Sequence, residues 1–390
     1  MSVTAPRGFR ASGVAAGMKA SGRLDLGLLL ADAPATAVGL FTTNAFPAAP
    51  VVLSRDRIAS GRARAVVVNS GQANAGTGEG GMADAMEMAG AAAEELGVGP
   101  EEVLVCSTGV IGPRVRMDAF REGLPRAAAG VAEEGGELFA EAILTTDRGP
   151  KETLVETDGF RVGGCVKGAG MIAPDLATML AFLTTDADVA TDDLDEIVRR
   201  HVGPVFGNLT VDGCSSTNDT VLVMASGASG VAATRGSPEA AALEEALHEA
   251  SVDLARRLVA EAEGSSKTLV VHVSGAADGE AARVAARALA GSLLVKTALF
   301  GEDPNAGRLL QAVGAAGVAL DPAGVRIDLA GHRVVEGGVV GAFDERRCRE
   351  AMKEREVAVR VELGVGEGEA TFFGCDLGYE YVRINAEYRT

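Results

Sequence analysis

The sequence lacks several features that mark common classes of protein. Its 390 residues include no tryptophan, only 3 tyrosines and only 4 histidines. No uninterrupted apolar run reaches the ~18 residues that a membrane helix needs, and the first residues lack the apolar segment of a signal peptide. We therefore expect a cytoplasmic protein that is not bound to a membrane.

Cysteine is also scarce and is not arranged in pairs. The five cysteines are widely spaced and form no C-x-x-C pattern, and their odd number does not suit a disulfide framework. Zinc sites need closely spaced ligands, so no metal site is indicated. We expect all five to be small buried residues in a reducing compartment: Cys106, Cys165, Cys214, Cys348 and Cys375.

Basic residues are outnumbered by acidic ones. The 36 lysines and arginines face 54 aspartates and glutamates, which gives a formal net charge of −18. Such a charge repels nucleic acid and anionic lipid, so neither is an expected partner. A small-molecule ligand fits this composition better.

Familiar catalytic patterns are missing or weak. Two of the four histidines, His248 and His272, fall within helical and strand patterns, which disfavours a Ser-His-Asp triad or a histidine metal site. There is no P-loop motif. Gly76–Gly81 fits G-x-G-x-x-G, but no ribose-binding acid ends the following strand, so a dinucleotide site is not indicated.

What the sequence does contain is an alternation of short apolar strands and alanine-rich helices, typical of an α/β layered fold. A helix is predicted over Met82–Leu96 with Gly97 as its cap, and another begins at Ser237-Pro238 and runs toward Gly264. The expected strands share short apolar or alternating patterns. They are 66–69, 103–106, 220–225, 268–273, 357–363 and 370–373.

The least ordinary stretch is Lys167–Leu180, in which glycines, a proline and one lysine surround Thr178. A threonine hydroxyl can attack the preceding carbonyl in an N-to-O acyl shift, and hydrolysis of the ester would cut the chain between Ala177 and Thr178. The new α-amine of Thr178, with an intrinsic pKa of ~7.7 to 8.0, could then serve as the base for its own hydroxyl. The alternative is a buried threonine in a turn.

Motifs along nearly the whole chain, this segment included, closely resemble those of the ornithine acetyltransferase family, the bifunctional glutamate N-acetyltransferases of arginine biosynthesis. The further motifs that carry the resemblance are Gly8–Lys19, Phe41–Asn44, Ala48–Val51, Asn69–Ala75, Ser107–Gly112, Thr145–Asp147, Glu261–Lys267, Phe300–Asn305 and Tyr381–Thr390.

The resemblance implies a fold, an assembly and a reaction. The fold is a layered α-β-β-α sandwich of the N-terminal-nucleophile type, shared with DmpA-like enzymes. Residues 1–177 and 178–390 become an α and a β fragment that stay intertwined, in a heterotetramer with two of each. The reaction is acetyl transfer from N2-acetylornithine to L-glutamate by a ping-pong mechanism, without a cofactor, with acetyl-CoA as a possible second acetyl donor.

The resemblance also implies roles for individual residues. Thr178 matches the nucleophile, and Thr108 with Gly109 matches the oxyanion hole. Lys167 matches a ligand for the substrate α-carboxylate, and Glu263 is a suitable partner for a substrate ammonium. The remaining substrate ligands implied by the match are Thr145 or Thr146, with Thr146 favoured, together with Thr178 itself, Asn385 and Thr390.

A few residues depart from the family pattern. Cys214-Ser215-Ser216 stands where the family usually has Asp-Thr-Ser, Ala306 replaces a tryptophan, and Gln72 stands where Asn is more common. We expect Cys214–Ser216 and Ala306 to lie near the pocket and to influence the choice of acyl donor. Two other functions stay open: an amidase or aminopeptidase that passes the acyl group from Thr178 to water, and an uncleaved amino-acid-binding protein.

Overall fold

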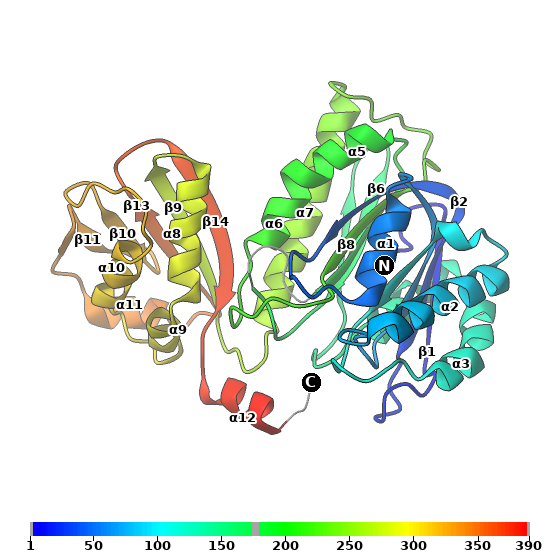
Figure 1. Ribbon diagram of the computed structural model, residues 1–390. Coiled ribbons are helices and arrows are strands. Elements are labelled where there is room, and N and C mark those ends of the chain that lie inside the picture. Colours follow the sequence, from blue (N-terminus) through cyan, green and yellow to red (C-terminus); the bar gives the residue numbers. More distant parts are fainter. Residues whose placement is uncertain (1–2, 174–178, 388–390) are drawn as a thin grey trace.

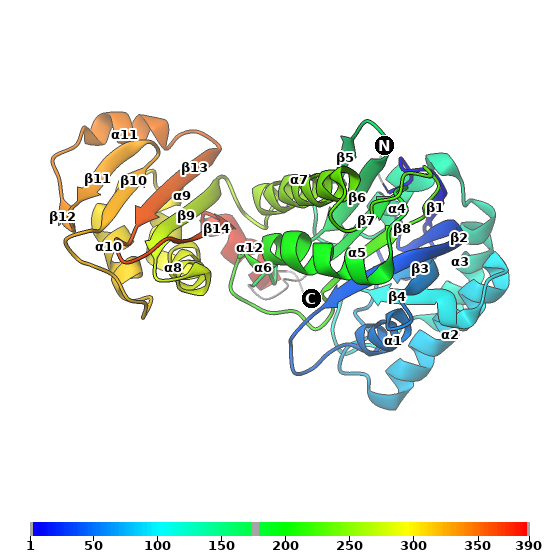
Figure 2. The ribbon, with the colours of Figure 1, turned by 90° about the horizontal axis from the view of Figure 1, so that it is seen from above.

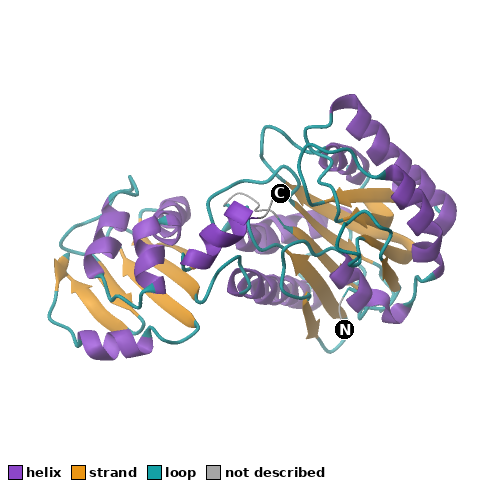
Figure 3. Ribbon diagram, turned by 90° about the horizontal axis from the view of Figure 1, so that it is seen from below, coloured by secondary structure: helices purple, strands orange, loops and turns teal. Residues whose placement is uncertain are grey.

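The computed structural model describes residues 3–173 and 179–387 and has an α/β architecture in two lobes (Figure 1). The larger lobe contains the chain from β1 to α7, and the smaller lobe contains β9 to β14. The last helix, α12 (Tyr379–Glu387), lies between the lobes (Figures 1 and 3). No helix within the described residues is long and apolar enough to cross a membrane.

The larger lobe is built on one eight-stranded sheet with the order β4-β3-β2-β8-β7-β6-β5 and with β1 added to β2. Its strands are β1 (Phe9–Val14), β2 (Leu26–Phe41), β3 (Arg62–Asn69), β4 (Val103–Ser107), β5 (Lys151–Glu156), β6 (Arg161–Lys167), β7 (Leu180–Thr185) and β8 (Thr220–Ala225). Its helices are α1 (Ala49–Ile58), α2 (Gly78–Leu96), α3 (Met117–Ala129), α4 (Gly136–Ala142), α5 (Thr191–Ile197), α6 (Gly203–Gly207) and α7 (Pro238–Ala260). Short 3₁₀ helices are η1 (Pro100–Glu102) and η2 (Glu133–Gly135), and η3 (Val198–Val202) is a π-helix.

Three apolar clusters show how this lobe is layered. Alternate residues of β2, β3 and β4 pack against α2 and α3. Alternate residues of β6, β7 and β8 pack against α5 and α7. The residues on the other face of each of these two sets of strands pack together in a third cluster, which the two sets share. The long strand β2 belongs to both sets, because it pairs with β3 in one and with β8 in the other (Figure 2). The layers therefore run helix, strand, strand, helix, and the predicted sandwich is confirmed in this lobe.

Local sequence signals account for the two helices that were predicted. Helix α2 ends at Leu96, and Gly97 follows in the left-handed conformation with φ of 66°, which glycine adopts without strain. Helix α7 begins after Ser237, whose hydroxyl accepts from the Ala240 amide at 3.0 Å, and Pro238 occupies the first helical position. α2 starts four residues earlier than predicted, and α7 ends at Ala260 rather than near Gly264.

Strands β6 and β7 lie on either side of the predicted cleavage point. They form an antiparallel ladder in which Lys167, the last residue of β6, pairs with Leu180, the first residue of β7. Every residue of β7 is buried. The predicted boundary between fragments therefore falls inside the larger lobe, and backbone hydrogen bonds join its two sides.

The smaller lobe is a six-stranded sheet with the order β12-β11-β10-β13-β9-β14 and its own apolar cluster. Its strands are β9 (Thr268–Ala276), β10 (Arg326–Leu329), β11 (His332–Glu336), β12 (Val339–Val340), β13 (Glu356–Glu362) and β14 (Gly368–Cys375), and its helices are α8 (Gly279–Gly291), α9 (Leu293–Phe300), α10 (Ala306–Gly314) and α11 (Glu345–Ala351). β9, β13 and β14 confirm predicted strands. Their assembly into a separate lobe was not predicted.

The lobes are joined where the chain crosses between them and along the edge strand β14. The Asp376 carboxylate accepts from the backbone amides of Ser266 and Lys267 at 2.9 and 3.0 Å. These bonds join the segment that enters the smaller lobe before β9 to the segment that leaves it after β14. Phe373 of β14 exchanges backbone hydrogen bonds with Asn208 and Thr210 of the larger lobe, at 2.9 and 3.0 Å. The edge of β14 that does not face β9 is thus paired, at Phe373, with the loop that leads into β8.

Candidate active site

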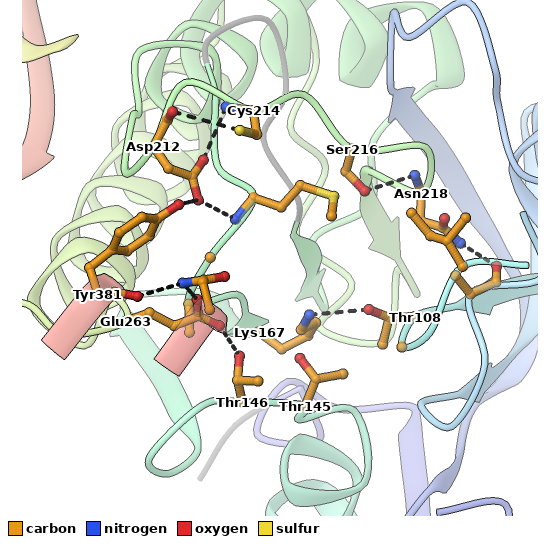
Figure 4. Close-up of a pocket in the computed structure, with 17 residues that line it drawn as sticks. Thr108, Thr145, Thr146, Lys167, Asp212, Cys214, Ser216, Asn218, Glu263 and Tyr381 are labelled. Carbon is orange, nitrogen blue, oxygen red and sulfur yellow. Dashed lines mark hydrogen bonds between the residues drawn. The ribbon is translucent and has the colours of Figure 1, made fainter. Parts of the chain in front are cut away.

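Most of the predicted site residues lie around one pocket of the larger lobe, although they come from distant parts of the sequence (Figure 4). Two of these residues follow the end of β4, two follow α4, one is the last residue of β6, one follows α7 and one lies on α12. The predicted residues that line it are Thr108, Gly109, Thr145, Thr146, Lys167, Glu263 and Asn385. Ala177, Thr178 and Thr390 lie outside the described residues.

The turn after β4 presents Thr108 and Gly109 to the pocket. Gly109 has φ of +118°, and a Cβ there would lie 2.5 Å from the carbonyl oxygen of Gly71, so only glycine fits. Its amide has no hydrogen-bond partner among the residues that the structure describes. The Thr108 hydroxyl accepts from Lys167 Nζ at 3.2 Å, which leaves its proton free to be donated. The turn can therefore offer a hydroxyl and an N–H to one oxygen.

Lys167 ends β6 with its ammonium in the pocket wall, and its side chain is only 2% exposed. Burial lowers its pKa, and the carboxylate of Asp147 opposes that change in part. A carboxylate that entered the pocket would favour the charged form in the same way. The charged form of Lys167, which burial disfavours, is therefore stabilised when an anionic ligand binds.

Asp147 organises the back of the site. Its Oδ1 accepts from Lys151 Nζ and from the Gly168 amide, both at 2.7 Å, and its Oδ2 accepts from the Thr145 amide at 3.0 Å. Burial alone would raise its pKa, but the ammonium groups of Lys151 and Lys167 outweigh burial and hold the pKa well below its usual range. This carboxylate fixes the loop of Thr145 to the turn that follows Lys167.

Glu263 joins two other predicted ligands directly. Its Oε1 accepts from the Thr146 hydroxyl at 2.7 Å, and its Oε2 accepts from Asn385 Nδ2 at 3.0 Å. Gly170 packs against this carboxylate, where a Cβ would collide with Oε2. Both Thr145 and Thr146 line the pocket, so the preference for Thr146 as a substrate ligand stays a prediction.

The polar groups of the pocket suit an amino-acid ligand and a developing negative charge on oxygen. None of the described residues that line the pocket is a histidine. Within 3–173 and 179–387, no group of three or more His, Cys, Asp or Glu side chains could hold a metal ion. The Gly109 amide, which has no partner within 3–173 and 179–387, and the neighbouring Thr108 hydroxyl form a turn suited to binding an oxyanion. Lys167 and Glu263 offer side chains of opposite charge type for an amino acid.

Comparison with known sequences decides the family. Residues 10–390 match the family model of the ArgJ family. The chain belongs to the ArgJ family. It is 46% identical to the arginine biosynthesis bifunctional protein ArgJ of Geobacter sulfurreducens, over 98% of this chain and 99% of that protein. It is 47% identical to the ArgJ protein of Symbiobacterium thermophilum, over 100% of this chain and 98% of the relative.

A solved ArgJ structure agrees with this assignment. The crystal structure of the arginine biosynthesis bifunctional protein ArgJ from Bacillus halodurans is 38% identical, with a TM-score of 0.53. The match covers 54% of this chain and 100% of that one, so the solved chain corresponds to about half of this sequence. The resemblance stated from the motifs is thus confirmed at the level of the family.

The ArgJ pocket also contains residues that the sequence did not single out. Asp212, Asn218 and Tyr381 line it, and Asn218 Nδ2 donates to the carbonyls of Ala73 and Ser107 at 2.6 and 2.7 Å. Asp212 and Asn218 belong to a polar loop between α6 and β8 that has no periodic pattern. The proximity of this loop to the end of β4 depends on tertiary contacts. The available signals were its dense run of Asp, Ser, Thr and Asn and the departure from the family pattern at Cys214–Ser216.

Two expectations about the unusual residues of this ArgJ chain need correction. Cys214 lines the pocket, as expected of the 214–216 segment, but it is exposed, whereas the other cysteines are buried as predicted. It lies in a turn whose backbone bonds to Asp212, which leaves its side chain outside the core. Ala306 does not line the pocket; it begins α10 and is buried in the core of the smaller lobe.

Proposed function

We propose that the protein transfers an acetyl group from N2-acetylornithine to L-glutamate in arginine biosynthesis. The observation that carries the proposal is the convergence of the Thr108-Gly109 turn, Lys167 and Glu263 on one pocket, in a chain of the ArgJ family. No cofactor is required, because one amide is exchanged for another of similar energy. We also propose that the protein works in the cytoplasm as a heterotetramer of two α and two β fragments.

In the first half-reaction, the Thr178 hydroxyl attacks the acetyl carbon of N2-acetylornithine and its own α-amine takes the proton. The Thr108 hydroxyl and the Gly109 amide stabilise the oxyanion of the tetrahedral intermediate. The C–N bond breaks, ornithine leaves with the proton on its amine, and the acetyl group stays as an ester on Thr178. The amine of glutamate then attacks the ester and restores the hydroxyl.

Substrate binding is assigned to charged and polar groups of the same pocket. Lys167 pairs with the α-carboxylate that both amino acids share. Glu263 is the partner for a substrate ammonium, and Thr145 or Thr146, Asn385 and Thr390 add polar contacts. Because the ester intermediate is reactive, water has to be excluded during the exchange.

The mechanism requires self-cleavage between Ala177 and Thr178. The half-length ArgJ chain of Bacillus halodurans supports such a cut. The β6–β7 ladder, which pairs Lys167 with Leu180, bears on how the two fragments would stay together. A nick at this position leaves the backbone hydrogen bonds of the ladder in place. The two fragments then stay in one folded unit.

The direct test is an assay that supplies purified protein with N2-acetylornithine and glutamate. Equal amounts of ornithine and N-acetylglutamate are expected. Release of acetate in the absence of glutamate would instead identify an amidase. No turnover at all, with an intact chain, would favour the amino-acid-binding alternative and contradict the proposal.

Thr108→Val is expected to lower the rate of acetyl transfer by about 10² to 10³, because one oxyanion donor is lost. Ornithine affinity is expected to change little, since the ground-state carbonyl needs this donor less than the transition state does. Thr108→Ser keeps a hydroxyl and serves as the matched control. Steady-state kinetics that give an unaltered rate for the valine variant would rule out this role for Thr108.

N2-acetylornithine is expected to be clearly the better acetyl donor, with acetyl-CoA used weakly at most. Lys167 is the only lysine or arginine among the described residues that line the pocket, and the chain has a net charge of −18. Few positive charges are therefore available to pair with the phosphates of CoA. The measurement is kcat/KM for N-acetylglutamate formation with each donor separately. Equal values, or a higher value with acetyl-CoA, would contradict this expectation.

A further inference from the structure

Helix α12 reaches the pocket with almost no apolar support. None of its residues is buried, and only Tyr381 and Ile384 are partly covered. Its first turn lies against Gly264, where a Cβ would collide with the Tyr381 amide nitrogen. Tertiary packing of an apolar face usually stabilises a short helix, so α12 depends on other contacts for its position.

Besides the edge-on packing of Tyr379 on Phe300, two side-chain hydrogen bonds supply those contacts. The Tyr381 hydroxyl donates to Asp212 Oδ2 at 3.2 Å (Figure 4). Asn385 Nδ2 donates to Glu263 Oε2 at 3.0 Å. Tyr381 and Asn385 are four residues apart, so they lie on the same face of the helix. Both acceptors are carboxylates at the pocket.

Asp212 is a rigid anchor for this purpose. Its Oδ2 also accepts from the Met171 amide at 2.7 Å, and its Oδ1 accepts from the amides of Ile172 and Cys214, both at 3.0 Å. Met171 has φ of +55°, an uncommon conformation that these bonds hold in place. Burial and the nearby Asp212 carboxylate raise the pKa of Tyr381, so its hydroxyl remains a donor.

We propose that Tyr381 is a positioning residue for substrate binding: its bond to Asp212 holds α12 so that Asn385 faces the pocket beside Glu263. The inference rests on the proposed function, in which Asn385 and Glu263 bind substrate. Tyr381 acts through Asn385 in this arrangement. Loss of its hydroxyl therefore weakens binding without removing any group that takes part in the acetyl transfer itself.

The test is Tyr381→Phe, with Tyr379→Phe as the matched control. Tyr379 lies on the same helix, and its ring packs on Phe300, a contact that phenylalanine preserves. Tyr381→Phe is expected to raise KM for both substrates roughly tenfold, as for the loss of one hydrogen bond to a charged group, with kcat within about twofold. Tyr379→Phe is expected to match the wild type.

A double-mutant cycle then separates positioning from independent binding. If Tyr381 acts through Asn385, Tyr381→Phe has little further effect on KM in an Asn385→Ala background. A tenfold effect in that background, or no effect of Tyr381→Phe in the wild type, would overturn the inference.

Hydrogen exchange provides a readout that does not depend on activity. The amides of Tyr379–Glu387 are expected to exchange faster in Tyr381→Phe than in Tyr379→Phe, because the helix detaches more often. Equal exchange in the two variants would also overturn the inference. A wild-type protein that does not transfer acetyl groups would contradict the proposed function alone, since the exchange experiment would still report on the bond to Asp212.

Discussion

Thr178→Ala is expected to remain a single chain of 390 residues and to lose acetyl transfer by more than about 10⁴-fold. Alanine has no hydroxyl to attack the Ala177 carbonyl, so the acyl shift cannot begin. It also cannot carry the acetyl ester, so neither half-reaction proceeds. Both losses follow from one missing oxygen atom.

Mass spectrometry under denaturing conditions measures the first loss. The wild type is expected to give fragments of 177 and 213 residues, and Thr178→Ala a single species. Thr178→Ser keeps a hydroxyl and is expected to be cleaved and to retain part of the activity. A wild-type protein that stays uncleaved on prolonged incubation, or an alanine variant that is cut, would contradict self-cleavage at this bond.

Asp147→Asn is expected to lower the free energy of unfolding by about 3 to 5 kcal/mol. Lys151 Nζ lies 2.7 Å from Asp147 Oδ1, and the two side chains are 1% and 0% exposed. The substitution leaves a buried ammonium that has lost its closest charge partner. Glu261 Oε2 lies farther from Lys151 Nζ, at 3.4 Å, and compensates only in part.

Urea denaturation measures this change at constant pH. Asp158→Asn, in the exposed turn between β5 and β6, is the matched control and is expected to change stability by less than about 0.5 kcal/mol. Because the folded pKa of Asp147 is below the unfolded value of ~3.9, its contribution is complete above that pH and declines as the pH falls further. The difference between wild type and Asp147→Asn should therefore shrink in acid. Equal stabilities at pH 7 would contradict the role of the pair.

The sequence predicted those parts of the fold that depend on local signals. Strands β3 and β4 contain the apolar runs Ala65–Val68 and Val103–Cys106, and α7 has a serine cap, a proline and leucines at helical spacing. The pairing of β14 with the loop before β8 has no such signal, because it joins residues more than 150 positions apart. The separate lobe was therefore not predictable from periodicity, although three of its strands were.

In the candidate site, too, the residues that belong to sequence motifs were predicted, and those that depend on contacts between distant segments were not. Lys167, Glu263 and the Thr108-Gly109 turn were found through family motifs that are far apart in the sequence and meet in the pocket. Asp212 and Tyr381 were missed, because their importance lies in a hydrogen bond across 169 positions. Asp212 stands in no motif, and Tyr381 begins the motif Tyr381–Thr390 without a role of its own being indicated there.

The pairing of β14 with Asn208–Thr210 has a consequence for the strength of the contact at Tyr381. From Phe373 the chain leads through a short segment to Tyr381, and from Leu209 it leads within a few residues to Asp212. The hydroxyl and the carboxylate are therefore tethered to neighbouring points, which gives them an effective concentration in the millimolar range or above. One hydrogen bond would not hold a separate peptide on this surface, but between two points that the chain already keeps close together it helps to hold α12 at the pocket.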